Sequence, residues 1–282
     1  MRKVLDWTRQ HFEKQDVDAP RLTAELLLAH LLKVDRVKLY VDLDRPLEKD
    51  ELARYRALIQ RRLAGEPTQY LMGVKEFYGR RFDVDPRVLI PRPETELLVE
   101  AVLRELPRDA PRRVLDLCTG SGCIALTIAA ERPLASVWAT DLSPDALAVA
   151  KANAEKLGLG SRVSFFQGDL FAAVPPATFD VVVSNPPYVK TGDLATLQRE
   201  VRQEPRAALD GGPEGLDAIG RIAAQAPGFL KAGGLLALEI GDEQGPSVKE
   251  LLVRAGCHDV RIEKDHARHD RLAFARAPQE HP

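Results

Sequence analysis

The pattern of apolar and polar residues changes twice along the chain. Up to Gly65 the apolar residues recur every three or four positions, most clearly in segments 4–12, 22–29 and 52–63. This spacing predicts amphipathic helices and no strand. Residues 1–65 are therefore predicted to form a small helical bundle.

In the second part, residues 66–92, the apolar positions recur with a period of two. Phe82 and Val84 alternate with Arg81 and Asp83. Such alternation between glycines predicts a β-hairpin, which would link the bundle to the remainder of the chain. The prolines of the IPRPETE segment then delay the next helix, because proline disfavours helix before it.

In the third part, residues 93–276, short apolar runs alternate with amphipathic helical segments. Buried parallel strands joined by crossover helices produce this pattern, so we expect an α/β domain with a mostly parallel sheet. Residues 277–282 are expected to be a frayed tail. The predicted strands are 114–117, 137–140, 163–166, 181–184, 235–240, 259–263 and 272–275, and the clearest helices are 144–157, 216–226 and 244–256.

Composition narrows the possible functions only slightly. The chain has 282 residues, 40 of them basic and 42 acidic, so no excess of charge points to a nucleic acid or a membrane surface. Its three cysteines lack the spacing of disulfide frameworks or zinc sites, which fits a reducing compartment. The N-terminus has no apolar signal-peptide core, and no run of about 18 apolar residues is present. We expect a cytoplasmic protein without a bound metal.

A glycine-rich loop, LDLCTGSGCIAL, follows the first strand of the third part. Gly120 and Gly122 permit a tight turn and a close approach of the backbone to a ligand, and the next helix directs its N-terminal amides there. Asp141 ends the second strand, where a carboxylate can accept both hydroxyl protons of a ribose. With Ala125, this loop fits a nicotinamide dinucleotide and S-adenosylmethionine equally well.

Two further acidic residues favour S-adenosylmethionine. Asp116 lies just before the loop, where it can attract a cationic amino group. Asp169, in the segment QGDLF after the third strand, can accept a hydrogen bond from an adenine amino group. A methionine ammonium, a ribose and an adenine would together use this series of partners, whereas a pyrophosphate has no use for Asp116.

The fourth strand runs directly into Asn185, Pro186, Pro187 and Tyr188. In isolation Asn-Pro-Pro is most often a turn that ends a strand. After a strand of this kind of domain, it suits an acceptor with a planar NH₂ group whose lone pair is delocalised. The Asn185 oxygen and a carbonyl beside Pro186 can each accept one N–H, the prolines hold these acceptors rigidly, and Tyr188 can stack on the plane.

The motifs LDLCTGSGCIAL, ATDLSPDAL, QGDLF and SNPPYV resemble those of amino-methyltransferases. With YLMGVKEFYGRRFDVDPRVLIPRPETE, EPRAALDGGPEGLD and LKAGGLLALEIGDEQG, the chain resembles the HemK/PrmC family of glutamine N(5)-methyltransferases from about residue 21 to residue 275. The resemblance implies a class I methyltransferase fold, which is Rossmann-like, with a seven-stranded sheet whose last strand is antiparallel. It also implies an acceptor, the glutamine of the GGQ loop in class I peptide chain release factors.

The resemblance further implies a role for each motif residue. S-adenosylmethionine would be the cofactor and S-adenosylhomocysteine the product, Asp141 would hold the ribose, and Asp169 with Leu170 would border the adenine. The helical bundle would help to dock the release factor. The methionine and ribose pocket would be lined by Cys118, Thr119, Gly120, Ser121 and Gly122, and the glutamine would be bound by Asn185, Pro186, Pro187 and Tyr188.

One residue departs from the wider class. Cys118 stands where the first glycine of the loop is usual, and we expect this small side chain to be tolerated.

Several alternatives remain at this stage. The same motif would serve a ribosomal-protein glutamine or an adenine amine of a nucleic acid, and the glycine loop alone would serve a non-catalytic dinucleotide-binding protein. Arg92, Glu94 and Thr95 are interpreted either as a helix start or as part of the acceptor cleft. His266 and His269 lack further ligands for a metal. We expect a monomer.

Overall fold

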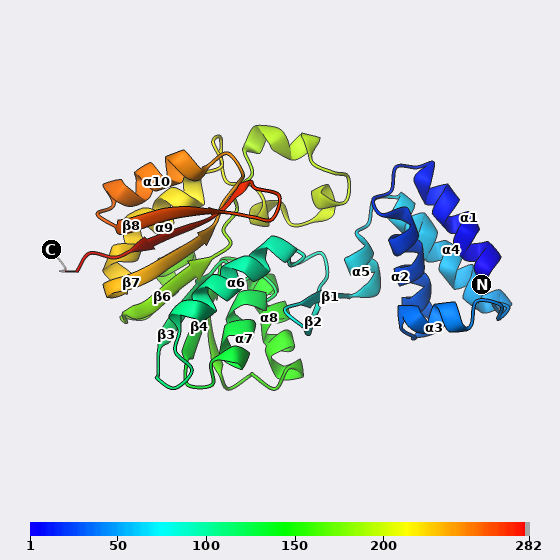
Figure 1. Ribbon diagram of the computed structural model, residues 1–282, viewed down its shortest axis with the longest axis horizontal. Helices are drawn as coiled ribbons and strands as arrows, with labels where there is room; N and C mark the ends of the chain where they lie inside the picture. Colours follow the sequence, from blue (N-terminus) through cyan, green and yellow to red (C-terminus); the bar gives the residue numbers. More distant parts are fainter. Residues whose placement is uncertain (280–282) are drawn as a thin grey trace. The chain divides into compact units, whose positions relative to one another are not determined.

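The computed structural model describes residues 1–279, which fall into two units (Figure 1). The first, called the helical unit below, comprises residues 1–74 together with residues 198–203. The second, called the sheet unit, comprises residues 75–197 and the chain from residue 204 onward. The short segment 198–203 thus belongs to a unit that is far away in sequence.

The helical unit contains five helices around one apolar core. Two of them, α3 and α5, were not predicted, because each is only about one turn long and offers little periodicity. The core is centred on Phe12, Leu27, Leu28, Leu39 and Tyr55, which are at most 1% exposed. The helices are α1 (Arg2–Glu13), α2 (Pro20–Leu32), α3 (Arg36–Val41), α4 (Lys49–Leu63) and α5 (Thr68–Met72).

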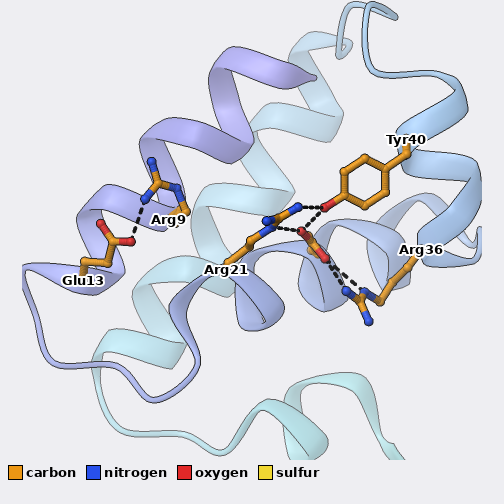
Figure 2. Close-up of polar contacts among 6 residues, drawn as sticks. Arg9, Glu13, Arg21, Arg36 and Tyr40 are labelled. Atoms are coloured by element: carbon orange, nitrogen blue, oxygen red, sulfur yellow. Dashed lines mark hydrogen bonds and ion pairs between the residues drawn. The ribbon is translucent and has the colours of Figure 1, made fainter.

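A buried carboxylate ties α2 to α3 in this unit (Figure 2). Glu25 accepts hydrogen bonds from Arg21, from Arg36 at 2.6 Å and from the Tyr40 hydroxyl, and its side chain is only 4% exposed. Burial by itself would raise the pKa of Glu25, but these three donors outweigh it and hold the pKa below its usual value. The cluster therefore keeps an ionised acid inside the helical unit.

The segment 198–203 is fixed to the end of α4 by polar contacts. Arg199 Nη1 donates to the Leu63 carbonyl at 2.8 Å, and the buried Arg62 forms an ion pair with Glu200. These contacts explain why the segment groups with the helical unit, although the sequence on both sides of it belongs to the sheet unit.

The sheet unit is built on seven strands in the order β5-β4-β3-β6-β7-β9-β8. Neighbours pair in parallel except β9, which is antiparallel to both β7 and β8. This confirms the expected Rossmann-like sheet with an antiparallel last strand. The strands are β3 (Arg113–Leu117), β4 (Ser136–Asp141), β5 (Val163–Gln167), β6 (Phe179–Ser184), β7 (Leu230–Glu239), β8 (His258–Lys264) and β9 (Asp270–Arg276).

Helices cover both faces of this sheet (Figure 1). On one face Val114 and Val181 pack under α6 (Pro93–Glu105), α7 (Cys123–Glu131) and α8 (Pro144–Lys156). On the other face Leu115 and Val182 pack under α9 (Asp217–Phe229) and α10 (Gly245–Arg254). Because successive side chains point to opposite faces and both faces are covered, the central strands β3, β6 and β7 are mostly buried and apolar, as their sequences predicted. The edge strands β5 and β8 are only partly buried. Three 3₁₀ turns complete the sheet unit: η1 (Leu170–Ala173), η2 (Thr191–Thr196) and η4 (Arg206–Ala208). A further 3₁₀ turn, η3 (Val201–Gln203), lies in the segment 198–203 of the helical unit.

The hairpin is shorter than the predicted linker of residues 66–92. Its strands are β1 (Val74–Phe77) and β2 (Arg80–Asp83), while residues 68–72 form the helix α5. The two connecting residues, Tyr78 and Gly79, both have positive φ, 50° and 69°, as a tight two-residue hairpin turn requires. The linker prediction was wrong at this end, since the helix α5 precedes the first strand.

The C-terminal tail also begins later than expected. Ala277 is fully buried, and its amide donates to the Gly234 carbonyl at 2.9 Å, so it extends the packing of β9. The rest of the predicted tail includes residues 280–282, which lie outside the described residues.

Among residues 1–279, none of the helices has both the length and the apolar character that crossing a membrane would require.

Candidate functional site

A cavity of about 370 Å³ lies in the sheet unit at the carboxyl ends of the central strands. Open α/β sheets bind their ligands at this edge. Seven of the predicted site residues line it, namely Cys118, Gly120, Asp141, Asp169, Leu170, Asn185 and Pro187. The other six, Asp116, Thr119, Ser121, Gly122, Pro186 and Tyr188, lie next to the lining residues in sequence or behind them.

The glycine loop makes a tight turn between β3 and α7. Its residues Cys118, Gly120 and Gly122 have φ of 58°, 55° and 82°, the left-handed region that favours glycine. A Cβ at Gly120 would meet no protein atom within 4 Å, so a ligand can approach this backbone closely. At Gly122 a Cβ would lie 3.0 Å from Leu126, so this glycine allows the loop to pack closely on the helix that comes after it.

Asp116 holds the loop from inside the protein. Its carboxylate is fully buried, and Oδ2 accepts from the Thr119 hydroxyl at 2.6 Å and from the Ala125 amide at 3.2 Å. Burial raises the pKa of Asp116 to about 7, although these two hydrogen bonds act in the opposite direction. Oδ1 has no hydrogen-bond partner among residues 1–279. Asp116 is thus behind the loop and not on the cavity wall, and its predicted contact with an ammonium group stays a prediction.

Asp141 faces the cavity with both oxygens partly satisfied. Oδ2 accepts from the Gly120 amide and Oδ1 from the Ser143 amide, each at 2.9 Å. Burial raises the pKa of Asp141, while these backbone hydrogen bonds lower it. A carboxylate has about four lone-pair positions, so both oxygens can accept a further hydrogen bond. Two adjacent acceptors of this kind fit the two hydroxyls of a ribose.

Apolar side chains form another part of the cavity wall, beside the charged Asp169. Val88, Leu89, Leu142 and Leu170 supply apolar surface that suits a flat heterocycle such as adenine. Leu170 is buried and has a φ of 53°, an unusual backbone conformation for a branched residue. Such residues cluster at ligand sites.

Asp169 lies at the same wall but already has a partner. Its Oδ2 accepts from Arg221 Nη2 at 2.7 Å, and both side chains are about half exposed. Arg221, from α9, also lines the cavity, and sequence analysis did not select it. An arginine on the exposed side of a helix carries no signal that distinguishes it from other surface charges.

At the opposite end of the cavity Asn185 is held by a chain of hydrogen bonds. Its Nδ2 donates to Thr95 Oγ1 at 3.2 Å, and Thr95 Oγ1 donates to Glu239 Oε2 at 2.6 Å. The Tyr188 hydroxyl donates to Glu239 Oε1 at 3.2 Å. Burial, together with the nearby Glu239 charge, raises the pKa of Tyr188. Tyr188 therefore points toward Glu239, and the stacking predicted for its ring stays a prediction.

The segment with Arg92, Glu94 and Thr95 forms the start of α6, and Thr95 also contacts the site residue Asn185. Proline at position 93 is the first residue of α6. Arg92 pairs with Glu204 at 2.5 Å, while Thr95 contacts Asn185. None of these three residues lines the described cavity.

Glu239 is the principal residue that sequence analysis missed. It is 1% exposed and ends β7, directly beside β6, whose last residue Ser184 is in register with Leu238. Its position next to Asn185 therefore follows from the strand pairing. The signal was a single carboxylate at the carboxyl end of the apolar run LLALEIG.

Two family models match the chain. One, described as the PrmC N-terminal domain, covers residues 3–73, and one, described as the methyltransferase small domain, covers residues 93–213.

Curated relatives match almost the whole chain. A release factor glutamine methyltransferase from Geobacter sulfurreducens is 47% identical over 98% of this chain and 96% of the relative. One from Moorella thermoacetica is 45% identical over 98% of both chains.

Solved structures share the fold of the sheet unit. A 16S rRNA methyltransferase from T. thermophilus, in complex with AdoMet and guanosine, matches with a TM-score of 0.54 and 21% identity over 72% of this chain and 49% of that chain. Because curated relatives are 45–47% identical over 98% of the chain, the chain belongs to the family of release factor glutamine methyltransferases.

Proposed function

We propose that this protein methylates the side-chain amide nitrogen of the glutamine in the GGQ motif of class I peptide chain release factors, with S-adenosylmethionine as the methyl donor. The observation that carries the proposal is the 47% identity to a release factor glutamine methyltransferase along 98% of the chain. The release factor glutamine methyltransferases match the helical unit as well as the sheet unit. A methyltransferase for another acceptor would be expected to share only the catalytic sheet unit.

Several groups on the cavity wall support S-adenosylmethionine as the methyl donor. Bound there, this cofactor supplies an electrophilic methyl group on a sulfonium sulfur. Asp141 would accept the ribose hydroxyls, the backbone at Gly120 would allow close approach of the ligand, and Leu170 would border the adenine beside Asp169. These residues would hold and orient the donor in the cavity that Asn185 also lines.

The acceptor end compensates for a poor nucleophile. An amide nitrogen shares its lone pair with the carbonyl, so the site must hold it in line and favour the form whose lone pair points at the methyl group. Asn185 Oδ1 and the carbonyl beside Pro186 each accept one N–H of the glutamine, and this directs the lone pair. As the N–C bond forms and the C–S bond breaks, the nitrogen becomes cationic and acidic. It then loses a proton to water, so no strong general base is required.

A methyl-transfer assay tests the proposal. Labelled S-adenosylmethionine should transfer its methyl group to a purified release factor but not to the Gln→Ala variant of its GGQ motif. Equal labelling of both would show that another residue is the acceptor. A purified ribosomal protein and an adenine-containing DNA, tested under the same conditions, should stay unlabelled. Calorimetric binding of NADH in preference to S-adenosylmethionine would instead support a dinucleotide-binding protein.

We also propose that the helical unit docks the release factor. Support comes from its exposed apolar side chains, since Trp7, Val37 and Val41 are 55%, 72% and 70% exposed. Exposed aromatic residues are frequent binding hot spots. A Trp7→Ala variant should raise KM for the intact release factor by at least about fivefold, because truncation of a contributing interface side chain costs more than about 1 kcal/mol.

The same variant should leave KM for a short GGQ peptide unchanged, since the peptide is too small to reach a second surface. Val253→Ala, at a similarly exposed position on α10, is the matched control and should change neither value. If Trp7→Ala changes both substrates equally or neither, Trp7 has no part in docking.

A further inference from the structure

The hydrogen bonds behind Asn185 run in a direction that the chemistry of each group fixes. Thr95 and Glu239 are both 1% exposed, so water does not compete for their hydrogen bonds. Thr95 belongs to α6, which precedes Asn185 in the sequence, and Glu239 ends β7, which follows it. The chain is Asn185 Nδ2 to Thr95 Oγ1 at 3.2 Å, and Thr95 Oγ1 to Glu239 Oε2 at 2.6 Å.

An ionised carboxylate only accepts hydrogen bonds, and a hydroxyl has a single proton to donate. Thr95 must therefore donate its proton to Glu239, which leaves only lone pairs on Oγ1 for its other neighbour. Asn185 can satisfy those lone pairs only with its NH₂ group. Its other amide atom, Oδ1, is then the one left for the cavity, which Asn185 lines.

The second oxygen of Glu239 serves the same motif. Oε1 accepts from the Tyr188 hydroxyl at 3.2 Å, so one buried carboxylate holds side chains at both ends of the Asn-Pro-Pro-Tyr sequence. Each oxygen of Glu239 accepts one hydroxyl proton, from Thr95 or from Tyr188. Neither hydroxyl then has a proton left to donate to another group. Each hydroxyl is therefore fixed as an acceptor toward its remaining neighbours.

We propose that Glu239, acting through Thr95, is a positioning residue that sets the Asn185 amide with its oxygen toward the acceptor nitrogen and thereby selects acceptors that offer an N–H. The inference rests on the proposed function and deepens it. If the Asn185 amide were turned over, its NH₂ would face the NH₂ of the glutamine, and two donors would oppose each other. The oriented oxygen favours a primary amide or an amino group over a fully substituted nitrogen.

The hydroxyl of Thr95 provides the sharpest test. Thr95→Val keeps the shape of the side chain and removes the proton, whereas Thr95→Ser keeps the proton and removes only a methyl group. We expect Thr95→Val to lower kcat by about 10- to 100-fold, since loss of an aligned geometry has effects of this size. KM for the release factor and Kd for S-adenosylmethionine should change by less than about threefold, and Thr95→Ser should recover most of the lost kcat. Full activity in Thr95→Val, or an equal loss in Thr95→Ser, would overturn the inference.

A second variant tests the carboxylate through the pH profile. Burial, with a smaller contribution from the Glu94 charge, raises the pKa of Glu239, while Thr95, Tyr188 and the positive charge of Arg271 act in the opposite direction. The buried Cys123 thiol also senses the charge of Glu239, which raises the pKa of that thiol. A protonated Glu239 could donate to Thr95 and free the threonine proton, so kcat should fall on the acid side. Glu239→Gln should lose this acid limb, and the exposed Glu243→Gln should keep it; identical profiles would contradict the role of Glu239.

A measurement on the protein without acceptor separates this inference from the proposed function. The NH₂ group of Asn185 should exchange with solvent slowly in the wild type, because one proton is held by buried Thr95, and at least about tenfold faster in Thr95→Val. Equal exchange rates would overturn the positioning role, whatever the acceptor. A wild-type protein that does not label the release factor would instead overturn the proposed function alone.

Discussion

The two ends of the cavity are built in different ways. The cofactor end, residues 118–122 with Asp141, Asp169 and Leu170, uses short stretches that each follow one strand, and Asp141 accepts from the backbone of the adjacent loops. At the acceptor end, Asn185 lines the cavity and is supported from behind by Thr95 and Glu239. Glu239 also binds Tyr188, and these side chains, up to 144 residues apart in sequence, contact one another directly.

This difference separates binding from orientation. At the cofactor end the carboxylate of Asp141 keeps lone pairs free for a ligand, so the role that we propose for it is binding. At the acceptor end the carboxylate of Glu239 has a protein hydroxyl donor on each oxygen, so its contribution is orientation. Variants at the first end should therefore change cofactor affinity, and variants at the second should change turnover.

Asn185→Ala should give the largest effect. It removes the acceptor that directs the glutamine nitrogen, and loss of one aligned polar group in an active site lowers kcat by about 10²- to 10³-fold. Kd for S-adenosylmethionine, measured by calorimetry, should change far less. Unchanged turnover would remove Asn185 from the mechanism, and a loss confined to cofactor binding would erase the distinction between the two ends.

Asp141→Ala should mainly weaken cofactor binding. Hydrogen bonds to a charged group contribute about 1.5–3 kcal/mol each, so the loss of two ribose contacts should raise Kd by at least about 100-fold. At saturating S-adenosylmethionine kcat should recover most of its wild-type value. Asp145→Asn, an exposed acid on the first turn of α8, is the control and should leave Kd unchanged. A large fall in kcat with normal affinity would contradict the assignment of Asp141 to binding.

Asp116→Asn should change the pH dependence of stability. The pKa of Asp116 is raised from 3.8 to about 7 by burial, so the folded protein holds its proton more tightly than the unfolded chain. The stabilisation is complete below pH 3.8 and is lost as the pH rises through 7. Between pH 5 and pH 7 the wild type should lose roughly 2 kcal/mol relative to the variant. Urea unfolding at both pH values measures this, and parallel changes in the two proteins would show that Asp116 is ionised throughout.

Cys118→Gly should have the smallest effect. Cys118 has a φ of 58°, where a side chain costs about 1 kcal/mol, but glycine loses more entropy on folding and would remove packing of the thiol against the core. We expect the free energy of unfolding to change by less than about 1 kcal/mol and Kd for the cofactor by less than about threefold. A sharp change in affinity would show that the thiol itself contacts the cofactor.

Most of the fold was predictable because its signals are local. The central strands of the sheet, such as β3, β6 and β7, are near-continuous apolar runs, and both faces of the sheet are covered, which is the condition that produces such runs. The short helices α3 and α5 were missed because one turn gives little periodicity. The segment 198–203 could not be assigned, since its contacts with Arg62 and Leu63 cross more than 130 residues.

The sequence by itself determined the glycine loop, Asp141, the Asn185 motif and the family, because each is carried by residues adjacent in the chain. Only the tertiary structure decided that Asp116 supports the loop from behind, that Thr95 contacts Asn185, and that Glu239 holds both Thr95 and Tyr188. The physical reason is that strand order and register bring the ends of β6 and β7 together. A hydrogen bond between side chains so far apart in sequence leaves no periodic trace along the chain.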